Sequence, residues 1–296
     1  MLTVAPALGR LDLARHYGTA DAAGIVATPI PGLKLMRASS DQGILSTVYQ
    51  PLICIVFQGE KRVSTQARTY AFPSGHALIV SGDIPVTSRI VEATPARPYV
   101  SAALTLDLAL LQELETTRPP VSRLAGAEDS GPIAIGPADP DVLSCFDRLL
   151  GLLERTSAID AVAPGIVREL HYWLLSGPHG PRLRALGRPD SHARRIARVT
   201  ALLRARFAEN LPGQVLADTA GMSLAAFHRH FRAATGRSPL QFQKHLRLLE
   251  ARRLMQAEGA RVTHAALAVG YESPSHFTRD YTRLFAAPPR IDRVSP

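Results

Sequence analysis

The stretch Val215–Pro239, VLADTAGMSLAAFHRHFRAATGRSP, has the pattern of two short helices joined by a tight turn. Gly221 marks the turn, because glycine adopts a positive φ angle without steric penalty. Ser223 is placed to cap the second helix by accepting a hydrogen bond from a free backbone N–H group. Phe227 and Phe231 lie four residues apart, on the side of that helix that we expect to be buried. The stretch therefore predicts a helix-turn-helix, whose second helix enters the DNA major groove.

The pattern occurs again near the C-terminus, in HAALAVGYESPSHFTRDYTRLFAAPP. The corresponding residues of the two copies are Gly221 and Gly270, Phe227 and Phe277, Phe231 and Tyr281, and Arg229 and Arg279. In the second copy, Ser273 and Pro274 supply a capping residue and a proline at the first helical position. A long helix from Pro239 to about Ala257 is expected between the copies. Such a rigid connection predicts two recognition helices in major-groove segments about 34 Å apart, one turn of DNA.

The positive charge of the chain is concentrated around this pair of motifs. Residues 190–296 hold 17 Lys and Arg against 8 Asp and Glu, a net charge of +9. The first 189 residues hold 17 of each sign and have no net charge. Clustered cations alone are more often a solvated surface. Together with the motif, they indicate a phosphate partner, whose neutralisation releases counterions.

The remaining composition predicts a cytoplasmic protein of two domains. Two cysteines, Cys54 and Cys145, make neither a disulfide framework nor a metal-binding spacing, which fits a reducing compartment. The first residues lack the continuous apolar core of a signal peptide, and no apolar run reaches 18 residues. We therefore expect no membrane partner and no cofactor or metal. A length of 296 residues is sufficient for two ordinary cores.

The first half of the chain has the pattern of a strand-rich module. Short runs rich in β-branched and aromatic residues are separated by turn residues, and this spacing predicts a small sandwich or barrel. The expected strands are 44–49, 51–58, 61–64, 69–72, 76–80, 86–92 and 99–106. His76 has no other histidine or cysteine nearby, so it is better explained as structural than as a metal ligand. No nucleophile elbow, phosphate loop or dinucleotide-binding glycine motif occurs, and enzyme chemistry finds no support.

Helices are expected after this module. Residues 107–115 form one, and apolar residues recur every three or four positions from Asp141 and again over Pro164–Leu175. The predicted division is a sensing domain at 1–140, a helical region at 141–185, a linker at 186–191 and the DNA-binding domain at 192–296. Residues 118–140 are expected to be a loop. The helical region either packs on the barrel or pairs with a second subunit, and the sequence leaves both open.

Several motifs resemble AraC/XylS-type transcription regulators. The first copy contains ADTAGMS and FRAATGRSP, the long helix contains LRLLEARRLM, and the second copy contains VGYESPSHF. In the first half, PLICIVFQGEKRV and the segment DIPV match the cupin-type N-terminal domain of one branch of the family. The resemblance implies an α+β protein with two domains: a cupin-like β-barrel with a helical segment, and an all-α domain with two helix-turn-helix motifs joined by a long helix.

The resemblance also implies a function. In that family such a protein is a sequence-specific DNA-binding regulator, often an activator, that contacts RNA polymerase, whose barrel responds to a small molecule or a partner and whose chains form homodimers in some relatives. Two departures concern the end of the second copy. Ala286-Ala287-Pro288 replaces the usual Gly-x-Ser, and Ile291-Asp292 replaces the closing Tyr-Arg. These departures weaken the prediction of a final helix after Pro289 and leave the predicted groove contacts unaffected.

Candidate contacts follow from positions in the motif. Contacts with base edges are assigned to Ala225, His228, Arg229, Ser275, His276 and Arg279. Arginine reads guanine through two hydrogen bonds, whereas alanine only touches a thymine methyl group. Contacts with phosphates position the protein without reading sequence. They are assigned to Ser223, Arg232, Arg237, Lys244, Ser273 and Arg283.

Two alternatives to a sensing regulator stay open. The barrel serves only for subunit contacts, or it is an enzyme with an accessory DNA-binding domain, which would need metal ligands or a nucleophile–base pair. The effector, the target promoters and the choice between activation and repression cannot be predicted from the sequence. Tyr49 and Arg62 are barrel-facing polar candidates only, without an assigned site.

Overall fold

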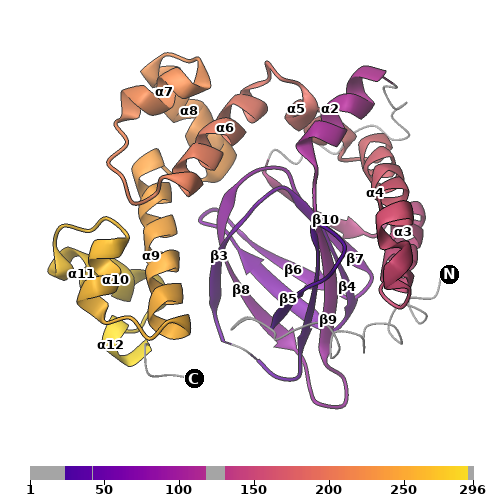
Figure 1. The fold of residues 1–296 in the computed structure, drawn as a ribbon, viewed down its shortest axis with the longest axis horizontal. Helices are drawn as coiled ribbons and strands as arrows, with labels where there is room; N and C mark the ends of the chain where they lie inside the picture. The colour runs from indigo at the N-terminus through magenta and orange to yellow at the C-terminus, as the bar shows by residue number, and fades with distance from the viewer. Residues whose placement is uncertain (1–23, 42, 118–130, 293–296) are drawn as a thin grey trace. The chain divides into compact units, whose positions relative to one another are not determined.

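The computed structural model describes residues 24–41, 43–117 and 131–292, and the chain divides into two compact units. The first consists of the residues before Arg195 except Ser46–Val48, and the second of Ser46–Val48 with the residues from Arg195 onward. Strands and flanking helices build the first unit, and the chain from Arg195 onward is helical (Figure 1). The expected α+β fold with a helical C-terminal domain is confirmed. Among the helices of the described residues, none is long and apolar enough to cross a membrane.

The larger sheet of the first unit has six strands in the described residues, and each pairing given for it is antiparallel. Its strands, in spatial order, are β1 (Ile25–Ala27), β2 (Leu33–Ala38), β9 (Tyr99–Thr105), β4 (Leu52–Gln58), β7 (His76–Val80) and β10 (Ile133–Pro137). Strand β10 lies inside the segment that was expected to be a loop. The prediction of a loop throughout 118–140 is therefore wrong at these five residues, and residues 118–130 lie outside the described part.

The smaller sheet has four strands in the same ranges, in the order β3 (Leu45–Tyr49), β8 (Ile84–Glu92), β5 (Glu60–Ser64) and β6 (Thr69–Pro73). Within the described residues, no backbone ladder joins its edges to those of the larger sheet. The strands therefore form two open sheets, as in the sandwich alternative, and not the closed barrel that the resemblance implied. Closure requires a continuous stagger of hydrogen bonds around all strands, and this property of distant pairings is not visible in local sequence.

The two faces of the larger sheet serve different cores. Side chains alternate between the faces of a strand, and along β4 the residues Ile53 and Ile55 pack against helices while Val56 packs toward the smaller sheet. The same alternation on β2 places Leu35 on the helical side and Met36 on the other. We call the second core, which lies between the two sheets, the intersheet core.

Helices cover the other face of the larger sheet. They are α2 (Leu108–Thr117), α3 (Pro140–Leu152), the 3₁₀ turn η2 (Thr156–Ala158), α4 (Ile159–Ser176) and α5 (Gly180–Gly187). Figure 1 shows α3 and α4 side by side, and both share one apolar core with the sheet. The region 141–185 thus packs on its own sheet, which was one of the two expectations for it. Helix α4 starts five residues before the expected Pro164.

The chain from Arg195 onward contains two small helical groups. Its helices are α6 (His192–Ala205), which begins just before the boundary, α7 (Gly213–Ala220), α8 (Leu224–Thr235), α9 (Pro239–Ala257), α10 (Val262–Ala268), α11 (Pro274–Phe285) and α12 (Pro289–Asp292). One core gathers Phe227, Phe231 and Phe242, and the other gathers Phe277 and Tyr281 with the C-terminal part of α9. The predicted limits of the sensing, helical and linker segments stay predictions.

Candidate nucleic-acid interface

The first helix-turn-helix is formed by α7 and α8. Gly221 has φ +62° and sits in the left-handed region, as expected for a glycine at this turn. Arg195 of α6 donates a hydrogen bond to the Gly221 carbonyl at 3.0 Å and so supports the turn from outside the motif. The Ser223 hydroxyl accepts a hydrogen bond from the Ala226 N–H at 3.4 Å and caps α8.

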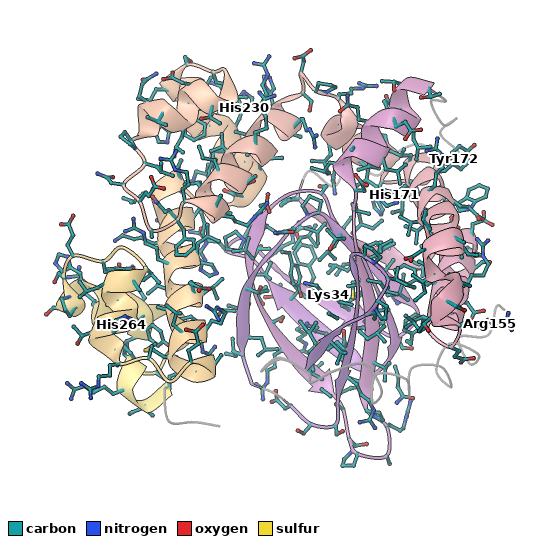
Figure 2. The ribbon with its side chains drawn as sticks, viewed as in Figure 1. Lys34, Arg155, His171, Tyr172, His230 and His264 are labelled. Carbon is teal, nitrogen blue, oxygen red and sulfur yellow. The ribbon has the colours of Figure 1, made fainter. Side chains whose placement is uncertain are left out.

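Helix α8 has one buried and one exposed face. Phe227 and Phe231 are fully buried, with ring centroids 5.4 Å apart, and Phe231 makes an edge contact with Phe242 of α9 at 5.6 Å. The opposite face exposes the predicted contact residues Ala225, His228, Arg229 and Arg232. Beside them, Arg229 lies 3.3 Å from the ring of His230, which Figure 2 shows on α8. The buried aromatic pair therefore determines which side chains α8 presents to solvent.

The second helix-turn-helix is formed by α10 and α11 and has a tighter turn. Gly270 has φ +84°, and a Cβ atom placed there would lie 2.1 Å from the Ala208 carbonyl oxygen. The Ser273 hydroxyl caps α11 by accepting a hydrogen bond from the His276 N–H at 3.4 Å. Phe277 is fully buried. The turn of this motif thus packs directly on the backbone that follows α6, so only glycine fits.

The exposed face of α11 contains more candidates than the sequence suggested. A solvent-open recess along it is lined by Pro274, Ser275, Thr278, Arg279, Thr282 and Arg283. When Phe277 is matched to Phe227, Thr278 takes the place of His228 and Thr282 that of Arg232. Neither threonine was among the predicted contacts, although this alignment of the repeats would have identified them. His276 is exposed on α11 but corresponds to Ala226.

The residues expected to contact phosphate differ in exposure and in the ion pairs that they form within the protein. Arg232 is exposed, and Ser223 and Ser273 stand at the N-termini of the two recognition helices. Partial burial lowers the pKa of the Arg237 guanidinium. Lys244 of α9 forms an ion pair of 3.0 Å with the buried Asp280 of α11.

Arg283 forms a second ion pair with Asp280, at 2.8 Å, although its side chain is 74% exposed. Because Asp280 is nearly fully buried, its charge requires these partners. Lys244 and Arg283 therefore both compensate an internal carboxylate.

Helix α9 connects the two motifs through a set of hydrogen bonds. Arg247 donates to the carbonyl oxygens of Phe207 at 2.7 Å, Ala208 at 3.2 Å and Glu209 at 2.8 Å, and also to that of Gly270 at 2.7 Å. Gln243, one turn earlier, donates to the carbonyl oxygens of Phe207 and Glu209. We call these contacts of Arg247 and Gln243 the α9 bridge. It joins the segment before the first motif to the turn of the second, and no local sequence signal predicted it.

The end of the second motif is also held from within. The Tyr281 hydroxyl donates a hydrogen bond of 2.5 Å to the buried Asp292 carboxylate, and Arg252 of α9 forms an ion pair with the same group at 2.9 Å. Ala286 takes the left-handed conformation, with φ 56°, where glycine is usual. A final helix, α12, is present despite the departures at these positions, and Asp292 is the residue that anchors it.

Two family comparisons match the chain at the two units. The family described as the AraC-type transcriptional regulator N-terminus matches residues 29–182, which is more than half of the chain. The chain belongs to this family. A helix-turn-helix domain family matches residues 216–293, which include the second motif of the AraC-type chain and all of the first except the first three residues of α7. The expected relationship to AraC/XylS-type regulators is confirmed.

Sequence relatives include HTH-type transcriptional activators named RhaS. The protein from Escherichia fergusonii is 29% identical over 152 residues, covering 51% of this chain and 54% of RhaS. The RhaS of Enterobacter sp. strain 638 is 31% identical over 101 residues, covering 34% of this chain and 36% of that protein. The AraC-type chain therefore spans about half, or less, of the length of the relatives that it matches.

Solved structures show the same fold at low identity. ToxT from Vibrio cholerae strain SCE256, with an unsaturated fatty acid bound, has a TM-score of 0.57 and 9% identity, and the match covers 88% of this chain and 94% of ToxT. A ligand-free variant of ToxT with a single substitution has the same TM-score, with 90% of this chain and 98% of ToxT covered. At this identity, the similarity concerns the fold alone.

Proposed function

We propose that this AraC-type chain is a sequence-specific DNA-binding transcription regulator. The observation that carries the proposal is the pair of helix-turn-helix motifs, which helix α9 connects and the α9 bridge supports. Each motif buries aromatic residues on one face and exposes the other. Arg229 in α8 and Arg279 in α11 take equivalent positions on the exposed faces. Such faces are suited to the major groove, where arginine binds guanine through two hydrogen bonds. The proposal includes no catalytic step.

Base contacts are assigned to the exposed faces of the two recognition helices. In α8 they come from Ala225, His228 and Arg229, and in α11 from Ser275, His276 and Arg279, with Thr278 added because it stands at the position of His228. Removing either arginine side chain should cost about 1–3 kcal/mol on the preferred base and relax the preference there.

Phosphate contacts are assigned around these faces. Arg232, Arg237, Ser223 and Ser273 are the main candidates, while Lys244 and Arg283 contribute less because they also neutralise Asp280. Free N–H groups at the start of a helix bind anions well, which supports the two capping serines as neighbours of phosphate. Binding should weaken steeply as salt increases, since each neutralised phosphate releases counterions.

The wider biology is proposed from relatives. RhaS proteins are transcriptional activators, which supports an activating role and contact with RNA polymerase. ToxT carries a bound fatty acid, which supports a small-molecule effector for the first unit. A homodimer and a cytoplasmic location fit this role. A first unit that makes only subunit contacts would bind no small molecule, and this difference is tested below.

The test uses the full chain and a library of random duplex DNA. We expect enrichment of one sequence motif at low salt, and an affinity that falls steeply between 50 and 200 mM salt, by about tenfold or more. Arg229→Ala should weaken binding to the enriched site much more than to random DNA. Arg253→Ala is the matched control, because Arg253 is an exposed arginine of α9 paired with Glu250 and Glu258. Absence of enrichment, or equal losses on both DNAs for Arg229→Ala, would contradict sequence reading.

A further inference from the structure

Two hydrogen-bond donors are buried between the sheets of the first unit without suitable acceptors. Lys61 of β5 is only 8% exposed, and Tyr99 of β9 is fully buried. Along β5, burial alternates so that Lys61 and Val63 point inward while Arg62 points to solvent. Lysine is rarely buried unless it is paired. The inward position of Lys61 therefore requires an explanation.

The ammonium group of Lys61 has a poor partner. Its Nζ atom lies 3.6 Å from the thioether sulfur of Met36, which is a weak acceptor. Among the described residues, no carboxylate forms an ion pair with Lys61. A buried charge without a counterion is strongly unfavourable. Lys61 thus lacks an anionic partner among the described residues.

The Tyr99 hydroxyl is in a similar position. It is buried, and no group in the described part of the chain lies at hydrogen-bonding geometry to it. Burial raises its pKa well above the usual value, and the nearby Ser101 hydroxyl opposes that shift. At neutral pH the group is therefore a phenol that has a proton to donate.

Lys61 and Tyr99 belong to the same part of the intersheet core, because Lys61 contacts Met36 of β2, and Met36 pairs with Ser101, which lies two residues from Tyr99 on the same face of β9. Burial raises the pKa of Cys54 to about 11, and the charge of Lys61 partly offsets this rise. Cys54 in turn influences Tyr99. We call Cys54, Lys61, Tyr99 and Ser101 the inner polar cluster.

We infer that the inner polar cluster binds the carboxylate of a small monocarboxylic acid, with Lys61 and Tyr99 as the donors. The proposal rests on the proposed function, because it names the effector class of the first unit. Both ligand oxygens would receive hydrogen bonds, one from the ammonium group and one from the phenol, and the ion pair would neutralise Lys61. The acid would displace the Met36 thioether, whose side chain is flexible.

The surroundings determine which anion fits. The intersheet core around the cluster is apolar and includes Phe72, Leu78, Val86 and Ile90. A single cation compensates one negative charge, so a dianion such as a phosphate monoester would bury an excess charge. The apolar walls suit a ligand whose part beyond the carboxylate is apolar. Cys54 remains a protonated thiol at neutral pH and takes no covalent part, since the thiolate is the reactive form.

The test is calorimetric titration of the full chain with hexanoate and octanoate, and with 1-hexanol and 1-octanol as uncharged controls of equal length. We expect each carboxylate to bind at least about tenfold more tightly than its alcohol. Lys61→Met should abolish this difference, and Tyr99→Phe should weaken carboxylate binding by about three- to tenfold. Arg62→Met, on the outward face of the same strand, should bind as the wild type does.

A second measurement guards against loss of folding. Without ligand, Lys61→Met should melt at the same temperature as the wild type or higher, because it removes an unpaired buried charge. A lower melting temperature would show that Lys61 is satisfied within the fold and would overturn the inference. So would carboxylates that bind no better than alcohols, or that bind Lys61→Met unchanged. None of these titrations contains DNA, so such results leave the DNA-binding proposal standing, and failed DNA enrichment leaves them valid.

Discussion

Replacing Arg247 by alanine tests whether the two motifs bind DNA as one unit. The substitution removes the donors to Phe207, Ala208, Glu209 and Gly270 that make most of the α9 bridge. A hydrogen bond from a charged group contributes about 1.5–3 kcal/mol. Arg247 is only half-buried and the carbonyls regain water, so we expect a total cost of about 2–4 kcal/mol. That is below the roughly 5–15 kcal/mol typical of a folded domain, and the variant should stay folded.

The loss should appear in binding to a complete site. Once the bridge is removed, the relative orientation of α8 and α11 must be fixed during binding. An ordering cost of about 1.4–2.8 kcal/mol lowers the affinity about 10- to 100-fold. DNA that keeps only one of the two segments should bind the variant and the wild type nearly equally, because each helix still reads its own groove.

Fluorescence anisotropy on DNA with both segments, and with either one scrambled, measures these affinities. Urea unfolding measures the stability, and Arg253→Ala is the control for loss of an exposed α9 arginine. If Arg247→Ala lowers the affinity equally for complete and half sites, Arg247 contacts DNA itself and the bridge explanation is wrong. An unchanged affinity for the complete site would also refute it.

Three further predictions concern stability. Gly270→Ala should lower the melting temperature by several degrees, because the added Cβ meets the Ala208 carbonyl and φ is +84°; near-wild-type melting in thermal unfolding would contradict the tight turn. Tyr281→Phe should cost about 1–3 kcal/mol in urea unfolding, since it leaves the buried Asp292 carboxylate without its hydroxyl donor, and an unchanged midpoint would argue against this anchor. His171 is buried in the helical side of the first unit (Figure 2); its Nε2 atom accepts from the Asp107 N–H at 2.9 Å, and burial lowers its pKa. The unfolded chain, with a histidine pKa of about 6.5, therefore binds the proton more readily, and the stability contribution of neutral His171 is present above that pH and lost as the pH falls. Between about pH 7.5 and 5, on either side of that value, the unfolding free energy should fall more for the wild type than for His171→Leu, and parallel curves would exclude this linkage.

The helical half of the fold was predictable because its signals are local. Turn glycines, capping serines and aromatic residues four apart define α7 and α8 within one stretch, and the repeat of the same signals defines α10 and α11. The exposed positions of Arg229 and Arg279 followed from that spacing. Thr278 was overlooked because its counterpart, His228, is a different type of residue.

Other features depend on contacts between distant residues. The pairing of strands into two open sheets is decided by registers such as Ile133 with Val80, which lie far apart in sequence. Helix α5 starts at Gly180 and Pro181; both residue types usually interrupt helices, but proline is favourable in the first turn. Arg247 and Lys61 look like ordinary surface cations in the sequence, and only their neighbours in the fold show what they do.

The central claim is that one chain reads two DNA segments with two helices. It is tested most directly by selecting binding sites from random DNA with the wild type, Arg229→Ala and Arg279→Ala. We predict a site of two segments whose centres are about 10–10.5 base pairs apart. Arg229→Ala should lose preference in one segment only, and Arg279→Ala only in the other. A site with a single segment, or two variants that lose preference at the same positions, would contradict the claim that the two helices read separate segments.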